Sequence, residues 1–288
     1  MKKIFVLIIT IFAVFFGFVF FYYFNQVGSL FRLFKEENRE YLSGPAGQEK
    51  ENAAPEQPFD IINAKGVKVP IIVYHSVRPY YFSDTKFVKQ FIVEPAVFER
   101  QMNFLRDNGY VAISFNDLLN LFEKGKPMPT KPVIINFDDG WENQYLNAFP
   151  ILKDKKFIAA FFVYTNSLGH EKFMTWDEVK ELSRAGMAIG SHTETHPYLF
   201  KISDPAVLKK EISGSKQILE ERLGEKINLF SYPYGQYSEK LMALVKESGY
   251  EAARGLAWGL YQKKEDKFNF KCFLVTNDFN KFVSILNK

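Results

Sequence analysis

VIINFDDG, residues 133–140, is the stretch from which the fold and the function of this chain are best inferred. Four apolar or β-favouring residues lead into Asp138 and Asp139, and Gly140 follows, which is typical of a buried strand that ends at the two carboxylates. Two adjacent carboxylates at the end of an interior strand are costly to bury unless something pairs with them. A metal ion is one such partner. The alternative is that one aspartate caps a helix that begins near Trp141.

Strand-like and helix-like segments alternate on both sides of this stretch. The predicted strands cover residues 69–74, 110–113, 132–137, 158–163, 187–190, 227–232, 250–254 and 270–275. The predicted helices cover residues 95–109, 114–125, 143–155, 175–186, 205–223, 238–248 and 279–286. Such alternation over about 220 residues is typical of an α/β protein with a parallel sheet and helices outside it. About seven units favour a closed or nearly closed barrel, whose site lies at the C-terminal strand ends, where the aspartate pair falls.

The first 66 residues differ in composition from the rest. An apolar run at residues 4–24 follows two lysines and, at 1.5 Å per residue, spans about 30 Å, the thickness of a bilayer core. No small-residue cleavage site ends the run, which favours an uncleaved signal anchor at residues 1–25 over a cleaved signal peptide. Residues 26–66 are predicted to be a juxtamembrane segment and a linker, and residues 67–288 a globular domain. We therefore expect a membrane-anchored protein whose domain is extracytoplasmic, either periplasmic or at the cell surface.

Charge and cysteine content exclude two kinds of site. The net charge of +4 is spread along the chain without a Lys/Arg-dense stripe, so no nucleic-acid partner is predicted. Cys272 is the only cysteine, which excludes an intramolecular disulfide and a cysteine-rich metal site.

Two of the four histidines lie in SHTETHP, residues 191–197, just beyond another predicted strand. His192 and His196 are four residues apart, so on a helical or turning segment they can point the same way. With one carboxylate they form a set of two nitrogen ligands and one oxygen ligand, which is typical of a catalytic zinc or similar divalent site with open positions. The alternative is two histidines in a polar loop.

Two further segments are candidates for the site. His75 follows the first predicted strand, and the alternative is a histidine satisfied by backbone groups; His170 is expected at the surface. In YPYG, residues 232–235, Tyr232 and Tyr234 surround a rigid proline beyond another strand, where aromatic rings can stack on a sugar; the alternative is a turn packed on the surface. Residues 79–91 are predicted to form a rim loop over the cleft.

NFDDG, SHTETHP and YPYG occur in this order on successive strand ends. Together with IIVYHSV, VFERQMNFLRDNGYVAIS and MTWDEVKELSRAGMAIGSHT, they make residues 70–288 resemble the polysaccharide deacetylase family, also called the NodB homology domain or carbohydrate esterase family 4. The family's usual first motif is TFDDG, and its second is His, Ser or Thr, two variable residues and His. The flanking phrases are most similar to the branch that deacetylates poly-β-1,6-N-acetylglucosamine.

The resemblance implies a distorted (β/α) barrel with a divalent metal, commonly zinc. Asp139, His192 and His196 match the metal ligands, Asp138 matches the general base, and the backbone around Tyr234 matches an oxyanion contact. The implied activity is hydrolysis of N-acetyl groups on N-acetylglucosamine-containing polysaccharide, either exopolysaccharide or cell-wall glycan, with release of acetate. Metal activation of water, proton transfer to a carboxylate and oxyanion stabilisation fit that reaction.

Three positions depart from the family pattern. Many members carry an arginine, which orients the base, two residues before the proline of the third motif, where this chain has Ser231. Many also carry a late Leu-x-His whose histidine protonates the leaving amine, yet no histidine follows His196, so the general acid is unassigned. Asn136 replaces the usual threonine. The first two departures keep open an alternative, a non-catalytic glycan-binding relative of such an enzyme.

Overall fold

The computed structural model describes residues 66–288. The predicted signal anchor at residues 1–25 and the linker up to residue 65 lie outside the described residues. Within residues 66–288, no helix has the length and apolar content that crossing a bilayer requires.

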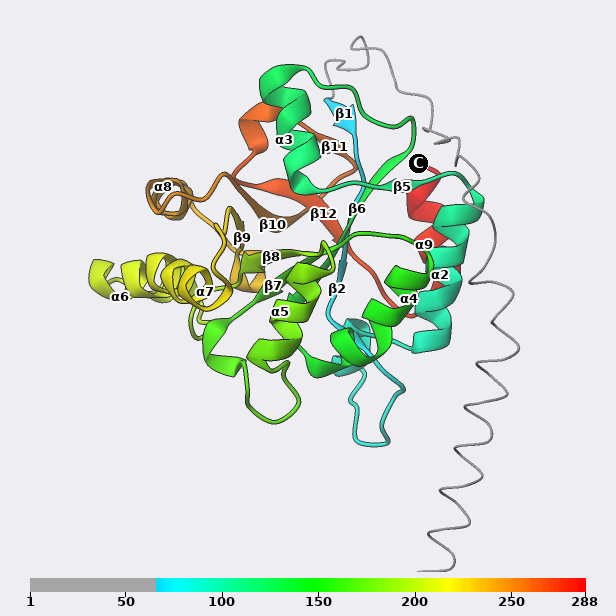
Figure 1. Cartoon of the computed structure of the whole chain (residues 1–288), viewed down its shortest axis with the longest axis horizontal. Helices are drawn as coiled ribbons and strands as arrows, with labels where there is room; N and C mark the ends of the chain where they lie inside the picture. The colour runs from blue at the N-terminus through cyan, green and yellow to red at the C-terminus, as the bar shows by residue number, and fades with distance from the viewer. Residues whose placement is uncertain (1–65) are drawn as a thin grey trace, which may run out of the picture. The chain divides into compact units, whose positions relative to one another are not determined.

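Seven parallel strands form a closed barrel (Figure 1). Around the ring they are β2 (Ile71–Tyr74), β12 (Phe270–Leu274), β10 (Ala252–Trp258), β9 (Leu229–Ser231), β8 (Ala188–Ser191), β7 (Ala160–Val163) and β6 (Pro132–Asp139). The ring closes because β6 also pairs with β2, with Ile71 opposite Ile134. Every neighbouring pair is parallel, which confirms the predicted barrel of about seven units.

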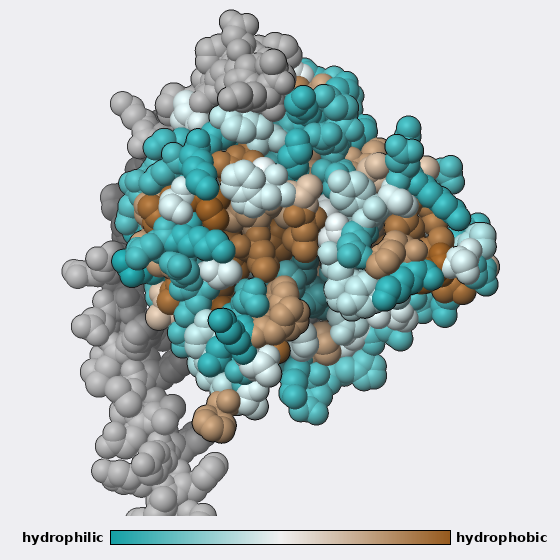
Figure 2. Space-filling model, turned by 180° about the vertical axis from the view of Figure 1, so that it is seen from behind, coloured by the Kyte–Doolittle hydropathy of each residue, from teal (hydrophilic) through white to brown (hydrophobic). Residues whose placement is uncertain are grey.

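The regular alternation of strand and helix fails in two places. The predicted strand at residues 110–113 is the short β5 (Val111–Ala112), which pairs only with the start of β6 and stays outside the ring. Between β10 and β12 there is no α-helix, only β11 (Tyr261–Gln262) and a 3₁₀ turn, η8 (Lys264–Asp266). β11 pairs with β1 (Val67–Lys68). Figure 2 shows the face opposite to that of Figure 1, where apolar side chains gather near the middle and polar ones surround them.

Helices flank the other barrel strands and follow the predicted segments closely. They are α2 (Pro95–Asp107), α3 (Phe115–Lys124), α4 (Phe149–Asp154), α5 (Trp176–Arg184), α6 (Pro205–Lys209), α7 (Ser215–Leu223), α8 (Glu239–Glu247) and α9 (Phe279–Leu286). A capping box begins α3, since the Ser114 hydroxyl accepts from the Asp117 amide and the Asp117 carboxylate accepts from the Ser114 amide. Thr175 and Glu178 form the same arrangement at the start of α5.

Two predicted helices contain π-helical segments. The long helix expected at residues 205–223 is α6 and α7 joined by η6 (Lys210–Gly214), and the helix expected at residues 143–155 is η3 (Gln144–Ala148) followed by α4. A π-helical turn inserts one extra residue and rotates the side chains that follow it, and such turns are frequent at functional sites.

Alternating residues of the strands enter two different cores. On β6, Val133, Ile135 and Phe137 belong to the cluster shared with the outer helices, whereas Ile134 belongs to a second cluster together with Phe115 and Leu118 of α3. Because side chains alternate along a strand, Asn136 and Asp138 share the face of Ile134. By the same alternation, Ser231 on β9 lies on the same face as Leu229, and Arg254 on β10 lies on the same face as Ala252. Leu229 and Ala252 both belong to the second cluster.

Candidate active site and metal centre

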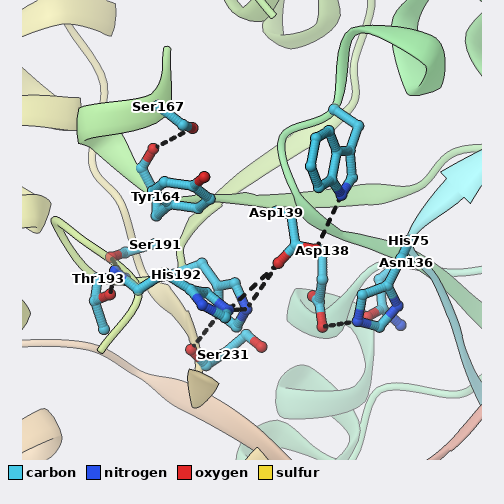
Figure 3. Close-up of polar contacts among 12 residues, drawn as sticks. His75, Asn136, Asp138, Asp139, Tyr164, Ser167, Ser191, His192, Thr193 and Ser231 are labelled. Atoms are coloured by element: carbon cyan, nitrogen blue, oxygen red, sulfur yellow. Dashed lines mark hydrogen bonds and ion pairs between the residues drawn. The ribbon is translucent and has the colours of Figure 1, made fainter. Parts of the chain in front are cut away.

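The two aspartates at the end of β6 point to different neighbours (Figure 3). Asp138 lies toward His75, whereas Asp139 lies toward His192. Asp139 has a positive φ of 76°, a backbone conformation uncommon outside glycine, and its carboxylate accepts from the Trp141 indole N–H at 3.0 Å. Neither carboxylate caps the helical turn that begins at Glu142, because Asp139 accepts from the Trp141 side chain and Asp138 from the Arg254 side chain. The capping alternative is therefore wrong.

Asp139, His192 and His196 form a compact cluster of three candidate ligand atoms. The Nε2 atoms of the histidines are 3.1 Å apart, and Asp139 Oδ1 lies 3.6 Å from His192 Nε2 and 3.4 Å from His196 Nε2. Two metal bonds of about 2.0–2.1 Å that meet at a tetrahedral angle place their ligand atoms about 3.3 Å apart. The chemistry and the spacing of this donor set therefore fit a divalent cation such as zinc.

His192 is held in the tautomer that a metal ligand requires. Its Nδ1 lies 2.7 Å from the carbonyl oxygen of Ser231, and because a carbonyl only accepts, Nδ1 carries the proton and Nε2 keeps its lone pair. Burial is the main cause that lowers the pKa of His192, to about 4, so the ring is neutral at pH 7. The histidine pair lies on a turn and not on a helix, with positive φ at Thr193 and at His196.

Asp138 is paired with a residue that the sequence reasoning missed. Arg254, on β10 and 1% exposed, donates from Nη2 to Asp138 Oδ1 and from Nε to Asn136 Oδ1, the latter at 2.7 Å. Burial alone would raise the pKa of Asp138, but the positive charge of the buried Arg254 outweighs it and lowers the pKa to about 2. Asp138 is therefore a carboxylate at any physiological pH.

The position of Arg254 accounts for two departures from the family pattern at once. Arg254 is the β-ladder partner of Ser231 on the neighbouring strand, so an arginine stands one strand away from where the family usually carries it. Asn136, which replaces the usual threonine, accepts from this arginine and donates to the Ile72 carbonyl at 2.9 Å. The available signal was a charged residue at the end of a predicted buried strand, the same signal that singled out Asp138.

His75 lies on the other side of Asp138. It follows β2 directly, and its Nε2 is 4.0 Å from Asp138 Oδ2. Its ring centroid is 5.1 Å from that of Phe91, the last residue of the predicted rim loop, so this end of the loop borders the site. Cover of the cleft by the rest of residues 79–91 stays a prediction. His170 is exposed, as expected.

The two tyrosines of YPYG have different environments. Tyr232 is 1% exposed and donates its hydroxyl to the Phe268 carbonyl at 3.1 Å, so its ring is enclosed by protein, which argues against a sugar-stacking role. Tyr234 is 44% exposed and has a φ of 58°. Its ring lies 4.7 Å from that of His196 and stacks on Tyr198 at 3.8 Å. Tyr234 is therefore the tyrosine of this motif that borders the candidate metal ligands.

The closed parallel barrel with an aspartate and two histidines at its C-terminal mouth defines an α/β-barrel protein with a candidate catalytic metal centre. A family profile described as polysaccharide deacetylase matches residues 125–253. The poly-β-1,6-N-acetyl-D-glucosamine N-deacetylase of Staphylococcus aureus strain MRSA252 is 30% identical over 197 residues, which cover 61% of this chain and 68% of that protein. The chain belongs to the polysaccharide deacetylase family.

Other similar proteins agree with this assignment. YxkH of Bacillus subtilis, named as a polysaccharide deacetylase, is 30% identical over 187 residues, which cover 65% of this chain and 64% of YxkH, so the chain spans less than two thirds of that relative. Among solved structures, BC0361, a polysaccharide deacetylase from Bacillus cereus, has a TM-score of 0.67 at 27% identity. The match covers 80% of this chain and 69% of the BC0361 chain. The deacetylase PplD of Streptococcus pyogenes shares the fold, with a TM-score of 0.71 at 23% identity over 77% of this chain and 99% of PplD.

Proposed function

We propose that the protein is a metal-dependent hydrolase that removes N-acetyl groups from an N-acetylglucosamine-containing polysaccharide. The observation that carries this proposal is the placement of a buried, ionised Asp138 beside the cluster of Asp139, His192 and His196. Those three residues would hold the cation. When bound, a divalent cation of this kind lowers the pKa of a water molecule and polarises a carbonyl group.

Asp138 is the proton acceptor in this proposal. Because the pair with Arg254 keeps it ionised and fixes one of its oxygens, Asp138 Oδ2 is the atom available to take the proton of the attacking water. The backbone N–H of Tyr234 is the candidate donor to the oxyanion that forms at the acetamide carbonyl. Its left-handed conformation is uncommon for a tyrosine and is typical of a backbone held for function.

His75 is the best candidate for the proton donor to the leaving amine. Of the four histidines, two belong to the candidate metal cluster and His170 is exposed, which leaves His75, 4.0 Å from Asp138. Amide hydrolysis needs a group that takes the proton of the attacking water and a group that protonates the leaving amine. A His75→Gln variant that released acetate at the wild-type rate would contradict this role.

The substrate that we propose first is a β-1,6-linked N-acetylglucosamine polymer, because the S. aureus relative is named as the deacetylase of that polymer. Peptidoglycan is the second candidate substrate. We also propose that residues 1–25 anchor the protein in the membrane, that residues 26–66 form the tether, and that residues 67–288 act outside the cytoplasm. Protection of the domain from added protease in intact cells would contradict a cell-surface location.

The test is acetate release from N-acetylglucosamine oligomers and from peptidoglycan fragments, after metal removal by a chelator and after addition of zinc or cobalt. The expected result is release that depends on added metal and is faster with the β-1,6-linked oligomers. Binding to an oligomer without release of acetate from any substrate would favour the alternative, a non-catalytic glycan-binding relative. That alternative rested on the missing arginine and the missing late histidine, for which Arg254 and His75 are now candidates.

A further inference from the structure

The turn that carries the two candidate ligand histidines has a backbone that needs outside support. Thr193 and His196 both have positive φ, at 73° and 60°, and neither is glycine. Such conformations persist only where the surrounding structure fixes them. One local bond contributes, since the His196 amide donates to Thr193 Oγ1 at 2.9 Å. The separation of the two imidazoles therefore depends on what holds Glu194 and Thr195 between them.

A buried carboxylate holds those two residues. Glu211, 5% exposed, accepts through Oε2 from the backbone amides of Glu194 at 3.0 Å and Thr195 at 2.9 Å. Its other oxygen accepts from the Thr195 hydroxyl at 2.6 Å. Within residues 66–288, no ion pair with Glu211 is found, so the three donors of the turn are what offset the burial of this carboxylate.

The π-helical segment between α6 and α7 brings Glu211 to the turn. Glu211 is the second residue of η6, and Ser215, the first residue of α7, donates its hydroxyl to the Glu211 carbonyl at 2.7 Å. The Ser215 hydroxyl also lies 2.8 Å from that of Ser191, which accepts from the Thr193 amide at 3.2 Å. The helix is thus bonded to the start and to the middle of the turn.

The other π-helical segment supports the opposite side of the site in a similar way. Gln144, the first residue of η3 and fully buried, donates from Nε2 to the carbonyl oxygens of Asp138 and His75, at 2.5 Å and 2.6 Å. Both distortions therefore place a buried polar side chain against the backbone of candidate site residues, and π-helical turns are frequent at functional sites.

We propose that Glu211 is a positioning residue that fixes the spacing of His192 and His196 and thereby sets the affinity of the site for a divalent cation. Glu211 is not part of the candidate ligand cluster and acts through the backbone of the turn. This inference rests on the proposed metal-dependent function. Loss of an outer-shell partner of a metal ligand typically weakens metal binding by about 10–100-fold.

The experiment measures zinc affinity of the full-length chain by competition with a chromophoric chelator, for the wild type, Glu211→Ala and Glu211→Gln. Glu211→Ala should bind zinc about 10–100-fold more weakly than the wild type. Glu211→Gln should lose less, because its amide oxygen can still accept from the turn while the Thr195 hydroxyl rotates to accept from the amide nitrogen. At saturating zinc, Glu211→Gln should regain most of the wild-type acetate release.

Glu220→Gln is the matched control. Glu220 lies on α7, and its carboxylate accepts from the backbone amide of Ile227 at 3.0 Å, far from the turn in the hydrogen-bond network. The zinc affinity of the Glu220→Gln variant should equal that of the wild type. Wild-type zinc affinity in both Glu211 variants would overturn the inference and leave the proposed function standing. A wild-type protein that binds no zinc, cobalt or manganese would overturn both, and if Glu211→Ala does not fold, Glu211→Gln decides.

Discussion

The two sides of the barrel mouth hold their functional groups by different means. The imidazole side contains Asp139, His192 and His196. The guanidinium side contains Asp138, Asn136 and Arg254. On the imidazole side, the histidines lie in one short turn, whose backbone amides donate to the Glu211 carboxylate, and His192 Nδ1 donates to the Ser231 carbonyl. On the guanidinium side, Arg254 is 116 residues from Asp138 and 118 from Asn136 in sequence, and the groups meet only because the barrel closes. A local motif therefore identifies the two histidines, although Asp139 reaches them from β6, whereas the pairing of Asp138 with Arg254 depends on strand order.

The largest effects are expected from changing the two aspartates one at a time. Asp138→Asn removes the proton acceptor, so it should lower kcat by about 10²–10⁴-fold and leave zinc affinity within a few-fold of the wild type. Asp139→Asn removes an anionic ligand and should weaken zinc binding first. Acetate release and chelator competition measure the two quantities. Equal losses of zinc affinity in both variants would contradict the separate roles of the two sides.

Arg254→Met should destabilise the protein by about 3–5 kcal/mol, because it leaves Asp138 buried and unpaired. Urea unfolding measures this change. Adding Asp138→Asn to Arg254→Met should recover part of the loss, since the remaining partner is then neutral. Arg222→Met is the control: Arg222 is exposed and lies over the Trp176 ring at 5.3 Å, so its loss should cost less than about 1 kcal/mol. Similar losses of unfolding free energy in Arg254→Met and Arg222→Met would contradict a buried ion pair between Arg254 and Asp138.

Moving the arginine tests whether an arginine at position 231 can replace Arg254 as the partner of Asp138. Because Ser231 and Arg254 are ladder partners whose side chains share the inward face, Ser231→Arg in the Arg254→Ser background should raise kcat by roughly tenfold over Arg254→Ser alone. Ser231→Arg in the wild-type background serves as the control, and it should lower activity because two arginines then compete for one carboxylate. No gain in the double variant would mean that Asn136 is needed to orient the guanidinium.

The smallest effect is expected from breaking an ion pair that ties Asp84 of the rim loop to Arg78, the residue before the loop. Arg78 donates to both oxygens of Asp84 at 2.8 Å, and this bond is the main cause that lowers the pKa of Asp84 to about 2. Since the pKa of Asp84 is depressed in the folded state, the ion pair contributes to stability above pH ~4, and this contribution is lost as the pH falls toward 2. Hydrogen exchange at the Tyr81 amide, which donates to Asp84 at 2.6 Å, should show the same protection at pH 7 and pH 5. Asp84→Asn should reduce that protection a few-fold.

Much of the fold follows from local sequence signals. The run into Asp138, the capping boxes at Ser114 and Thr175 and the glycine at 125 depend on neighbours within a few residues, so they could be predicted. The residues that could not be placed depend on distant partners. Arg254 is paired through the closure of the ring. Tyr232, which follows β9, is buried in the cluster shared with the outer helices, and Glu211 reaches its turn through a π-helical distortion that no local pattern signals.

The position of β2 in the ring also constrains how the chain folds. β2 is the first strand of the barrel in sequence, yet it lies between β6 and β12, and Ile72 pairs with both Ile135 and Phe273. During synthesis, one edge of β2 stays unpaired until β12, the last strand, has been made. Pairing β2 with β12 also closes a long loop, whose entropic cost comes before any stabilisation from the contact. An exposed edge strand is a template for pairing with other chains. Truncation just before residue 270 should therefore give an aggregating chain, even though every candidate catalytic and metal-binding residue would remain in it.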